Sequence, residues 1–319
     1  MESNGNDVAN TAVAALALLR AGKQYQPQVD RALTFILRKV EESPVKGLAI
    51  TDQNGTQIQR KLGPYIDTFL TSMLLAQVDG TLAGSTQNAR VRAALQKCVA
   101  KIEQNQQGDG SWNIAGGWAP VLGTSLASRS LFEAKQKGVG VSESVMVRAE
   151  DYTVKALDAA PPPKTSADGI GTGDTSLVVT ESRIKSLPTG GRTARSEMSA
   201  SAGVELYQNA QALEQLSRTD KDRVKNATKI AALNGRLSDT KFVEGFGSIG
   251  GEEFFSYLNI SDSLKRTGGE AWKKWHSQIT GKILKLQNND GTWAGHHCIT
   301  GRVAVTAAAI LNLTVDYAY

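Results

Sequence analysis

A seven-residue pattern, Gln-x-x-Asp-Gly-[Ser/Thr]-Trp, occurs at residues 106–112 and again at residues 287–293. Each copy follows an amphipathic stretch that contains Lys and precedes an apolar, Ala-rich stretch. Asp-Gly favours a tight turn, because Gly adopts positive φ without steric cost, and the Trp is placed to cover the corner. The pattern predicts a corner between two helices in a chain of repeated helical units. The residues assigned to the two corners are Gln106, Asp109, Gly110, Trp112, Gln287, Asp290, Gly291 and Trp293.

Two kinds of helical stretch alternate along the chain. Six stretches are apolar nearly all round and must be buried; they are residues 8–22, 65–78, 119–137, 194–218, 252–266 and 297–315. Five others are amphipathic and charged, with one face suited to water; they are residues 28–42, 89–104, 143–157, 220–237 and 270–287. No strand-like alternation appears. The alternation predicts an all-α fold in two concentric layers.

The repeat resembles that of the α/α toroid superfamily, which includes squalene and oxidosqualene cyclases, protein prenyltransferase β-subunits and the thioester domains of complement-like proteins. The resemblance implies an (α/α)6 toroid of inner and outer helices as a single domain over residues 1–319, with an irregular insertion at about 160–192. Five outer helices for six inner ones leave one missing at the N-terminus, either upstream of Met1 or through imperfect closure of the ring.

Members of this superfamily place their chemistry at the mouth where the inner helices begin. By that resemblance the catalytic candidates are Glu252, Glu253 and His297. A wider charged mouth predicts ligand-binding roles for Arg192, Arg195, Arg302 and Asp67, since guanidinium groups bind phosphate or carboxylate in a forked geometry. The alternative interpretation of these charges is a set of ion pairs that tie inner helices together.

Prenyltransferase β-subunits hold a zinc ion with Asp, Cys and His at the starts of two inner helices. At the matching places this chain offers Glu253, His297 and Cys298, which are all competent zinc ligands. Zinc is therefore the cofactor that the resemblance implies. The family's Asp-x-Cys is replaced here by Glu-Glu, and the Cys has moved beside the His. The alternative is a hydrogen-bonded His297 at a helix start beside a small buried thiol.

Two other activities of the superfamily fit the sequence poorly. Class II terpene cyclases use an Asp-x-Asp-Asp motif, which is absent from the sequence, and aromatic faces that stabilise cations, whereas aromatic residues make up only 6% of this chain. An internal thioester needs Cys and Gln where this chain has Gly250 and Glu253. Two functions stay open: a non-catalytic binding or scaffold module that uses the mouth of the barrel, and a prenyltransferase-like or cyclase-like enzyme. The first predicts a protein partner, and the second predicts an isoprenoid or other apolar ligand.

Charge and hydropathy narrow the remaining classes. The net charge of +5 is spread along the chain without the clusters of Lys, Arg and aromatic residues that bind nucleic acid. No apolar run approaches the 18 residues or so of a membrane-spanning helix. The first ten residues are polar and lack the features of a signal peptide. Two cysteines cannot form a disulfide framework, so the sequence leaves the compartment open.

Overall fold

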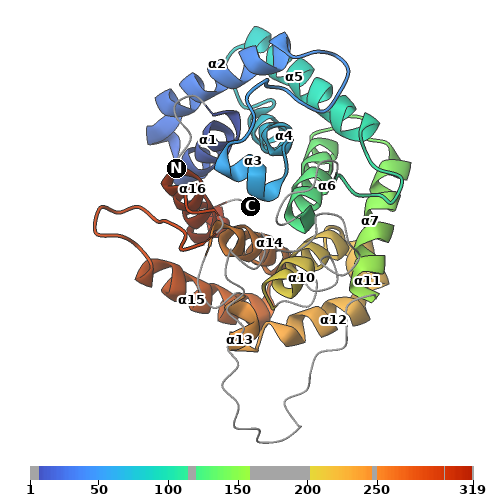
Figure 1. The fold of residues 1–319 in the computed structure, drawn as a ribbon, viewed down its shortest axis with the longest axis vertical. Helices are drawn as coiled ribbons and strands as arrows, with labels where there is room; N and C mark the ends of the chain where they lie inside the picture. The colour runs from blue at the N-terminus through green and yellow to red at the C-terminus, as the bar shows by residue number, and fades with distance from the viewer. Residues whose placement is uncertain (1–6, 114–119, 159–201, 246–249, 298, 318–319) are drawn as a thin grey trace, which may run out of the picture.

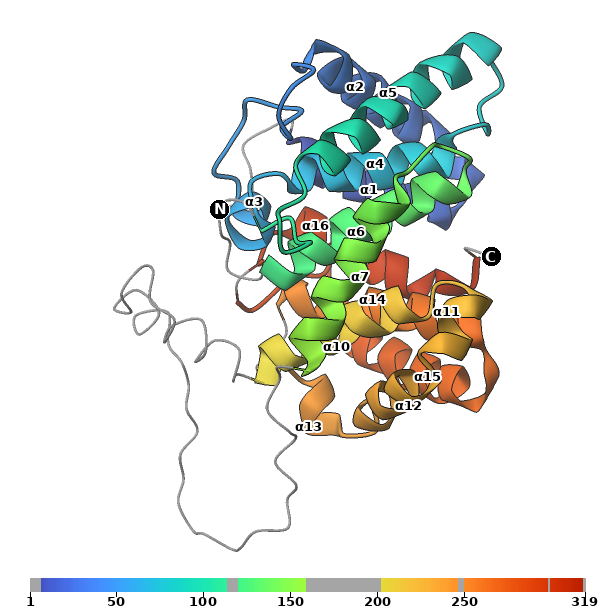
Figure 2. The ribbon, with the colours of Figure 1, turned by 90° about the vertical axis from the view of Figure 1, so that its right-hand side faces the viewer.

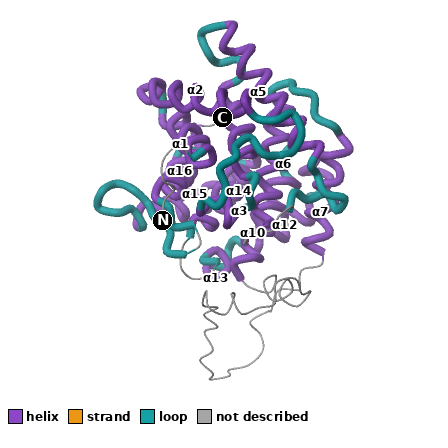
Figure 3. The backbone as a smooth tube through the Cα atoms, turned by 45° about the horizontal axis from the view of Figure 1, so that its top comes forward, coloured by secondary structure: helices purple, strands orange, loops and turns teal. Residues whose placement is uncertain are grey.

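The computed structural model describes residues 7–113, 120–158, 202–245, 250–297 and 299–317. Within these ranges the chain folds into helices joined by loops, with no strand (Figure 3). The predicted all-α class is therefore confirmed. None of the helices in these ranges has both the length and the hydropathy needed to cross a bilayer.

Figure 1 shows one group of helices toward the centre of the molecule. They are α1 (Val8–Ala21), α4 (Ile66–Val78), α6 (Pro120–Gln136), α10 (Ala202–Leu216), α14 (Gly251–Thr267) and α16 (Arg302–Leu313). Each packs on the next in chain order, and α16 packs back on α1, so the order of packing returns to its start. Along α4 every residue except Gln77 is buried, as the apolar sequence of that stretch requires.

A second group of helices lies outside these six. They are α2 (Gln26–Glu42), α5 (Ser85–Gln104), α7 (Glu143–Asp158), α11 (Asp220–Lys225), α12 (Ala227–Arg236) and α15 (Gly269–Lys285). Figure 2 shows α7 on the outside, where it packs against α6 and α10. The shorter elements are η1 (Lys23–Tyr25), α3 (Gln57–Leu62), α13 (Thr240–Val243) and η2 (Val315–Tyr317).

The two Trp corners make matching contacts. Trp112 is 4% exposed, and its indole N–H donates to the carbonyl oxygen of Ile102 at 2.7 Å. Trp293 is equally buried and donates to the carbonyl oxygen of Ile283 at 2.8 Å. In both corners the indole therefore reaches back ten residues to the last turns of the preceding outer helix. Each Trp thus adds a second donor to a carbonyl group near the end of a helix, where carbonyl groups run out of partners within the helix.

The Gln and Gly of each corner also repeat their contacts. The side-chain amide of Gln106 donates to the carbonyl oxygen of Gly110 at 3.0 Å, and that of Gln287 donates to Gly291 at 2.9 Å. Both glycines have positive φ, 92° and 81°. At Gly110 a β-carbon would lie 2.1 Å from the carbonyl oxygen of Arg148, so the corner packs directly on the backbone of α7.

Several predicted element bounds differ from the structure. The stretch 220–237, predicted as one helix, is broken at Asn226, whose side chain turns back to the carbonyl oxygen of Leu216. The inner helix predicted from residue 297 begins only at Arg302, so its start was wrong by five residues. Neither α3 nor α13 was predicted. The predicted insertion at 160–192 and the first residues of the stretch 194–218 lie outside the described residues.

Candidate functional site

The candidate site is built at the first turn of α14. Gly250 is the N-cap of this helix, and Glu252 and Glu253 follow it with both side chains fully buried. The Glu253 carboxylate turns back to accept the Gly250 backbone N–H at 2.9 Å. Acidic residues are favoured in a first turn because they satisfy free N–H groups and complement the helix dipole. The local sequence therefore explains why two carboxylates are tolerated in the interior.

Three glycines bring the loop before α16 onto this helix start. A β-carbon on Gly250 would lie 2.8 Å from the His297 ring, and one on Gly251 would lie 2.7 Å from the Ile299 side chain. At Gly295 it would lie 2.1 Å from the Ile299 carbonyl oxygen. Any larger residue at these positions would push the loop, and His297 with it, away from the two acids.

Glu253 is the better-satisfied acid of the pair. Its Oε1 accepts the Tyr207 hydroxyl at 3.1 Å and lies 3.5 Å from Nε2 of His297, while Oε2 accepts the Gly250 N–H. The carboxylate is thus held between α10, α14 and the loop before α16. His297 is the most exposed member of the cluster, with 22% of its side chain accessible.

Glu252 is held at one oxygen only. Its Oε2 accepts the backbone N–H of Ile299 at 3.1 Å, whereas Oε1 is buried and has no hydrogen-bond partner among the described residues. Burial raises the pKa of Glu252 to about 7, and the charge of neighbouring Glu253 adds to this rise. Hydrogen bonds from the backbone lower the pKa but do not outweigh burial. A buried acceptor without a donor is unfavourable and marks a place where a ligand could supply one.

The same cluster fits a metal ion. One ligand atom each from Glu252, Glu253 and His297 can be chosen so that all three lie within 4.8 Å of one another. Two carboxylates and an imidazole are ligands that zinc accepts, and three protein ligands leave a fourth position open. The unpartnered Oε1 of Glu252 is the atom most available for coordination. Cys298, the third predicted ligand, lies outside the described residues, and Glu252 stands in the cluster instead.

His297 was predicted to open an inner helix, and this was wrong. Ile299, Thr300 and Gly301 are not helical, and side chains from other elements accept hydrogen bonds from their backbone N–H groups. Glu252 accepts from Ile299, and Oε1 of Gln57 accepts from Thr300 at 3.1 Å and from Gly301 at 2.9 Å. Gly301 is the N-cap, and α16 starts at Arg302.

Asp67 lies in the first turn of α4 and is 2% exposed. It accepts the Ala9 backbone N–H at 2.9 Å and the Gln59 side-chain amide at 2.6 Å. Burial is the main cause that raises the pKa of Asp67 to about 6, and nearby Asp7 adds to it. With both oxygens engaged, Asp67 joins α4 to α1 and α3 at the same end of the molecule as the acid pair.

Only one of the three predicted arginines, Arg302, lies among the described residues. Arg302 is exposed, and its guanidinium pairs with Asp290 of the second Trp corner. Arg192 and Arg195 lie outside the described residues.

The opposite ends of the inner helices contain a buried ionic network that the sequence analysis missed. Arg129 of α6 pairs with Glu133 and with Asp262 of α14, and both partners of the Arg129–Asp262 pair are almost inaccessible. Burial opposes ionisation of Glu214 in α10, but Arg218 and Arg266 outweigh it and hold its pKa at about 2. The available signal was a set of charged residues in otherwise apolar stretches.

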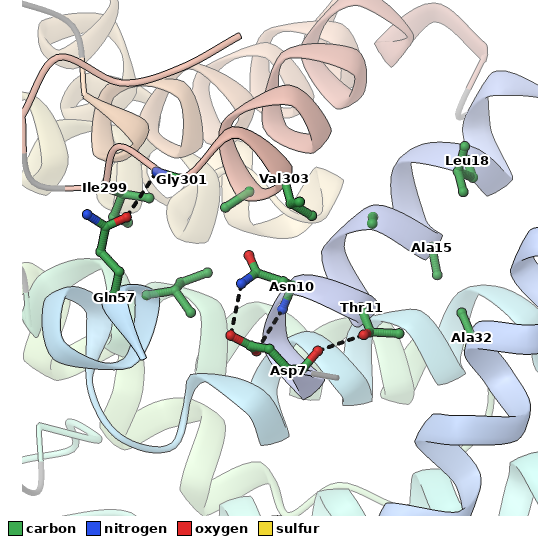
Figure 4. A pocket seen from close by; sticks show the side chains of 13 residues that line it. Asp7, Asn10, Thr11, Ala15, Leu18, Ala32, Gln57, Ile299, Gly301 and Val303 are labelled. Carbon is green, nitrogen blue, oxygen red and sulfur yellow. Dashed lines mark hydrogen bonds between the residues drawn. The ribbon is translucent and has the colours of Figure 1, made fainter. Parts of the chain in front are cut away.

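A pocket of about 350 Å³ lies beside the acid cluster, across Ile299 and between α1, α3 and α16 (Figure 4). Its polar end contains Asp7, Asn10, Thr11 and Gln57, and its apolar wall includes Leu18 and Val303. Figure 4 shows Asp7 bonded to Asn10 and Thr11 on the same turn of α1, and Gln57 bonded to Gly301 across the pocket.

Comparisons with protein-family models, with curated proteins and with solved structures find no match for this chain.

Proposed function

We propose that this protein is an α/α toroid related to the squalene cyclases and the prenyltransferase β-subunits. Three observations support the assignment. The inner helices pack in an order that returns from α16 to α1, and the amphipathic helices lie outside them. The two Trp corners make equivalent hydrogen bonds. The (α/α)6 arrangement accounts for all three with one repeated helical unit.

Within that fold, the protein acts as a non-catalytic binding module that holds its ligand or protein partner at the mouth where α1, α4 and α14 begin. The observation that carries this function is Glu252, a fully buried carboxylate with one oxygen that lacks a donor among the described residues. A ligand that brings an N–H group or a positive charge to this oxygen removes the penalty of burying it. The part-exposed His297 marks the side of approach. The ligand class is therefore a cation or a cationic side chain of a partner.

The function is tested on the freshly purified chain. Native mass spectrometry reports retained metal, lipid and assembly state together. Thermal unfolding at pH 7.5 is then followed with zinc, magnesium or arginine amide added. We expect at least one of these to raise the Tm of the wild type, to have no effect on Glu252→Gln, and to act fully on the exposed control Glu42→Gln. A wild type that carries nothing and responds to none of the three probes would contradict the proposal.

The metal-ligand set supports a second candidate, a metal-assisted enzyme. Glu252, Glu253 and His297 would hold zinc, which in prenyltransferases stabilises the thiolate that attacks an isoprenoid diphosphate. The role of this chain's own residues is to fix the site: Tyr207 and the Gly250 N–H orient Glu253, and the Ile299 N–H orients Glu252. The apolar wall of the adjacent pocket suits an isoprenoid chain.

The two candidates separate in one assay. Zinc-loaded protein is incubated with an isoprenoid diphosphate and a thiol peptide, and the peptide mass is measured. Transfer that is lost in His297→Ala supports the enzyme. Stoichiometric zinc binding without any transfer supports the binding module.

A further inference from the structure

The loop that leads into α3 carries an Asn-Gly pair, Asn54-Gly55, on the surface of the molecule. Both residues are exposed and lie outside any regular element. Gly55 has a φ of 74°, and a β-carbon built on it would meet nothing within 4 Å. Within the described part of the chain, neither the Gly55 N–H nor the Asn54 side chain makes a hydrogen bond. The two groups are therefore free to approach each other.

An asparagine in this setting can react with the backbone of the next residue. The Gly55 nitrogen attacks the side-chain carbonyl carbon of Asn54 and forms a C–N bond. The side-chain nitrogen leaves as ammonia and takes up the proton that the Gly55 nitrogen loses. Water then opens the resulting cyclic imide at either of its carbonyl carbons, which leaves aspartate or isoaspartate at position 54. Glycine favours the ring closure, since it has no β-carbon and a freely adaptable backbone.

A second Asn-Gly pair of the described chain is protected by its helix. Asn234 and Gly235 lie within α12, where the Gly235 N–H donates along the helix. The side-chain oxygen of Asn234 is buried. Ring closure would require the Gly235 nitrogen to leave the helical hydrogen-bond ladder and turn toward the side chain. The same two residues are therefore reactive in the loop and unreactive in α12. A third pair, Asn4-Gly5, lies outside the described residues.

One glutamine side chain holds the chain on both sides of the loop pair. Nε2 of Gln59 donates to the Gln53 carbonyl oxygen at 2.9 Å, and Oε1 of Gln59 accepts the Thr56 N–H at 3.1 Å. The same Nε2 donates to Asp67 of α4 at 2.6 Å. Gln59 and Thr56 also form the capping box that starts α3. A single amide group thus fixes the span of the loop and joins α3 to α4.

We propose that Asn54 is a site of spontaneous deamidation in the folded protein, and that its isoaspartate form releases α3 from the mouth. Isoaspartate routes the main chain through the side chain and so adds one carbon atom to the backbone between Gln53 and Thr56. The amide of Gln59 can then no longer bridge both sides of the loop, and the capping box is lost. With six residues, α3 has little helix stability of its own. Figure 1 shows α3 between α1, α4 and α6, so its release uncovers the centre of this face.

The first test compares the two pairs within one protein. Wild-type protein is incubated for weeks at pH 7.5 in heavy-oxygen water, which marks deamidation that precedes digestion. Trypsin then gives the peptides 47–60 and 230–236, each with one Asn-Gly pair, and mass spectrometry measures their conversion. A parallel sample is unfolded in urea. We expect Asn54 to convert at least tenfold faster than Asn234 in the folded protein, and at nearly the same rate in urea.

Either of two results overturns the modification site. One is conversion of Asn54 as slow as that of Asn234 in the folded protein. The other is a tenfold difference that persists in urea, because the neighbouring sequence and not the fold would then decide the rate.

The second test measures the release of α3 by hydrogen exchange. Converted protein is isolated by ion exchange, since it carries one more negative charge. Exchange is read from peptic peptides over residues 54–63, whose isoaspartate and aspartate forms elute separately. We expect at least tenfold faster exchange in the isoaspartate form than in unaged protein. Asn54→Asp adds the charge without the extra backbone carbon and should exchange like the wild type. Unchanged exchange in the isoaspartate form, or equally fast exchange in Asn54→Asp, overturns the proposed release.

Discussion

Replacing Glu252 with Gln should stabilise the metal-free protein, and increasingly so as the pH rises. Burial raises the pKa of this carboxyl from an ordinary 4.5 to about 7. Between these two values the native state holds a proton that the unfolded chain has released. The free energy of unfolding therefore falls as pH rises through this window. Gln keeps an oxygen for the Ile299 N–H and has no charge to bury.

The magnitude follows from the shift in pKa. About 2.5 pH units at about 1.4 kcal/mol per unit gives roughly 3 kcal/mol at pH 7.5. At pH 4, where Glu252 is protonated in both states, wild type and variant should be nearly equally stable. The difference between them should then grow by about 1.4 kcal/mol per unit up to about pH 7 and stay level above it.

The assay is urea unfolding, followed by tryptophan fluorescence, in EDTA at half-unit steps from pH 4 to 8. Taking the difference between wild type and Glu252→Gln removes the contribution of groups common to both, such as Asp67. The exposed control Glu42→Gln should follow the wild type within about 0.5 kcal/mol at every pH. Wild-type and Glu252→Gln profiles that run parallel through this range would refute the claim that the carboxylate is buried without compensation.

Three further predictions concern the fold. Gly110→Ala should lower the free energy of unfolding by more than about 3 kcal/mol, because its β-carbon would meet a backbone carbonyl of α7. Gly291→Ala, at the same corner position but without such a clash, should lose only the roughly 1–2 kcal/mol of a left-handed conformation. Chemical denaturation of the two variants compares these losses. Arg129→Met should cost about 3–5 kcal/mol by removing the close partner of buried Asp262 and leaving only Arg20, 3.9 Å away, and the double variant Arg129→Met/Asp262→Leu should recover most of that loss in the same assay. Cys98 is fully buried and burial raises its pKa to about 12, so its peptide should remain unmodified by iodoacetamide in the native protein and become labelled in urea, as read by mass spectrometry.

Much of the helical layout could be predicted because its signals are local. The apolar run at 65–78 and the regularly spaced apolar residues of α2 can be recognised in the sequence itself. The Asp-Gly pair followed by Trp marks both corners. Asn226 shows the limit of such signals. Its side chain bonds to Leu216, ten residues away, and the amphipathic pattern runs through the break without a sign of it.

The sequence could predict which residues form the candidate site, but not how they are hydrogen-bonded. The resemblance placed Glu252, Glu253 and His297 at one mouth, and the structure brings them together. It could not show that Glu252 lacks a donor at one oxygen, since that depends on the path of the loop before α16. Nor could local pattern pair Arg129 with Asp262, which lie 133 residues apart. Such pairs become visible only when the inward faces of two helices meet.

The three residues Ile299, Thr300 and Gly301 have a consequence for how two binding events affect each other. Their N–H groups are divided between Glu252 on one side and Gln57 at the polar end of the pocket on the other. A ligand that draws the Glu252 carboxylate toward itself loosens this backbone, and a molecule seated in the pocket against Gly301 and Val303 restrains it. Because binding free energies are coupled reciprocally, whatever factor a cation at Glu252 imposes on the affinity of the pocket for its occupant, that occupant must impose on the affinity for the cation. One short segment would then set the sign of cooperativity between the acid cluster and the pocket.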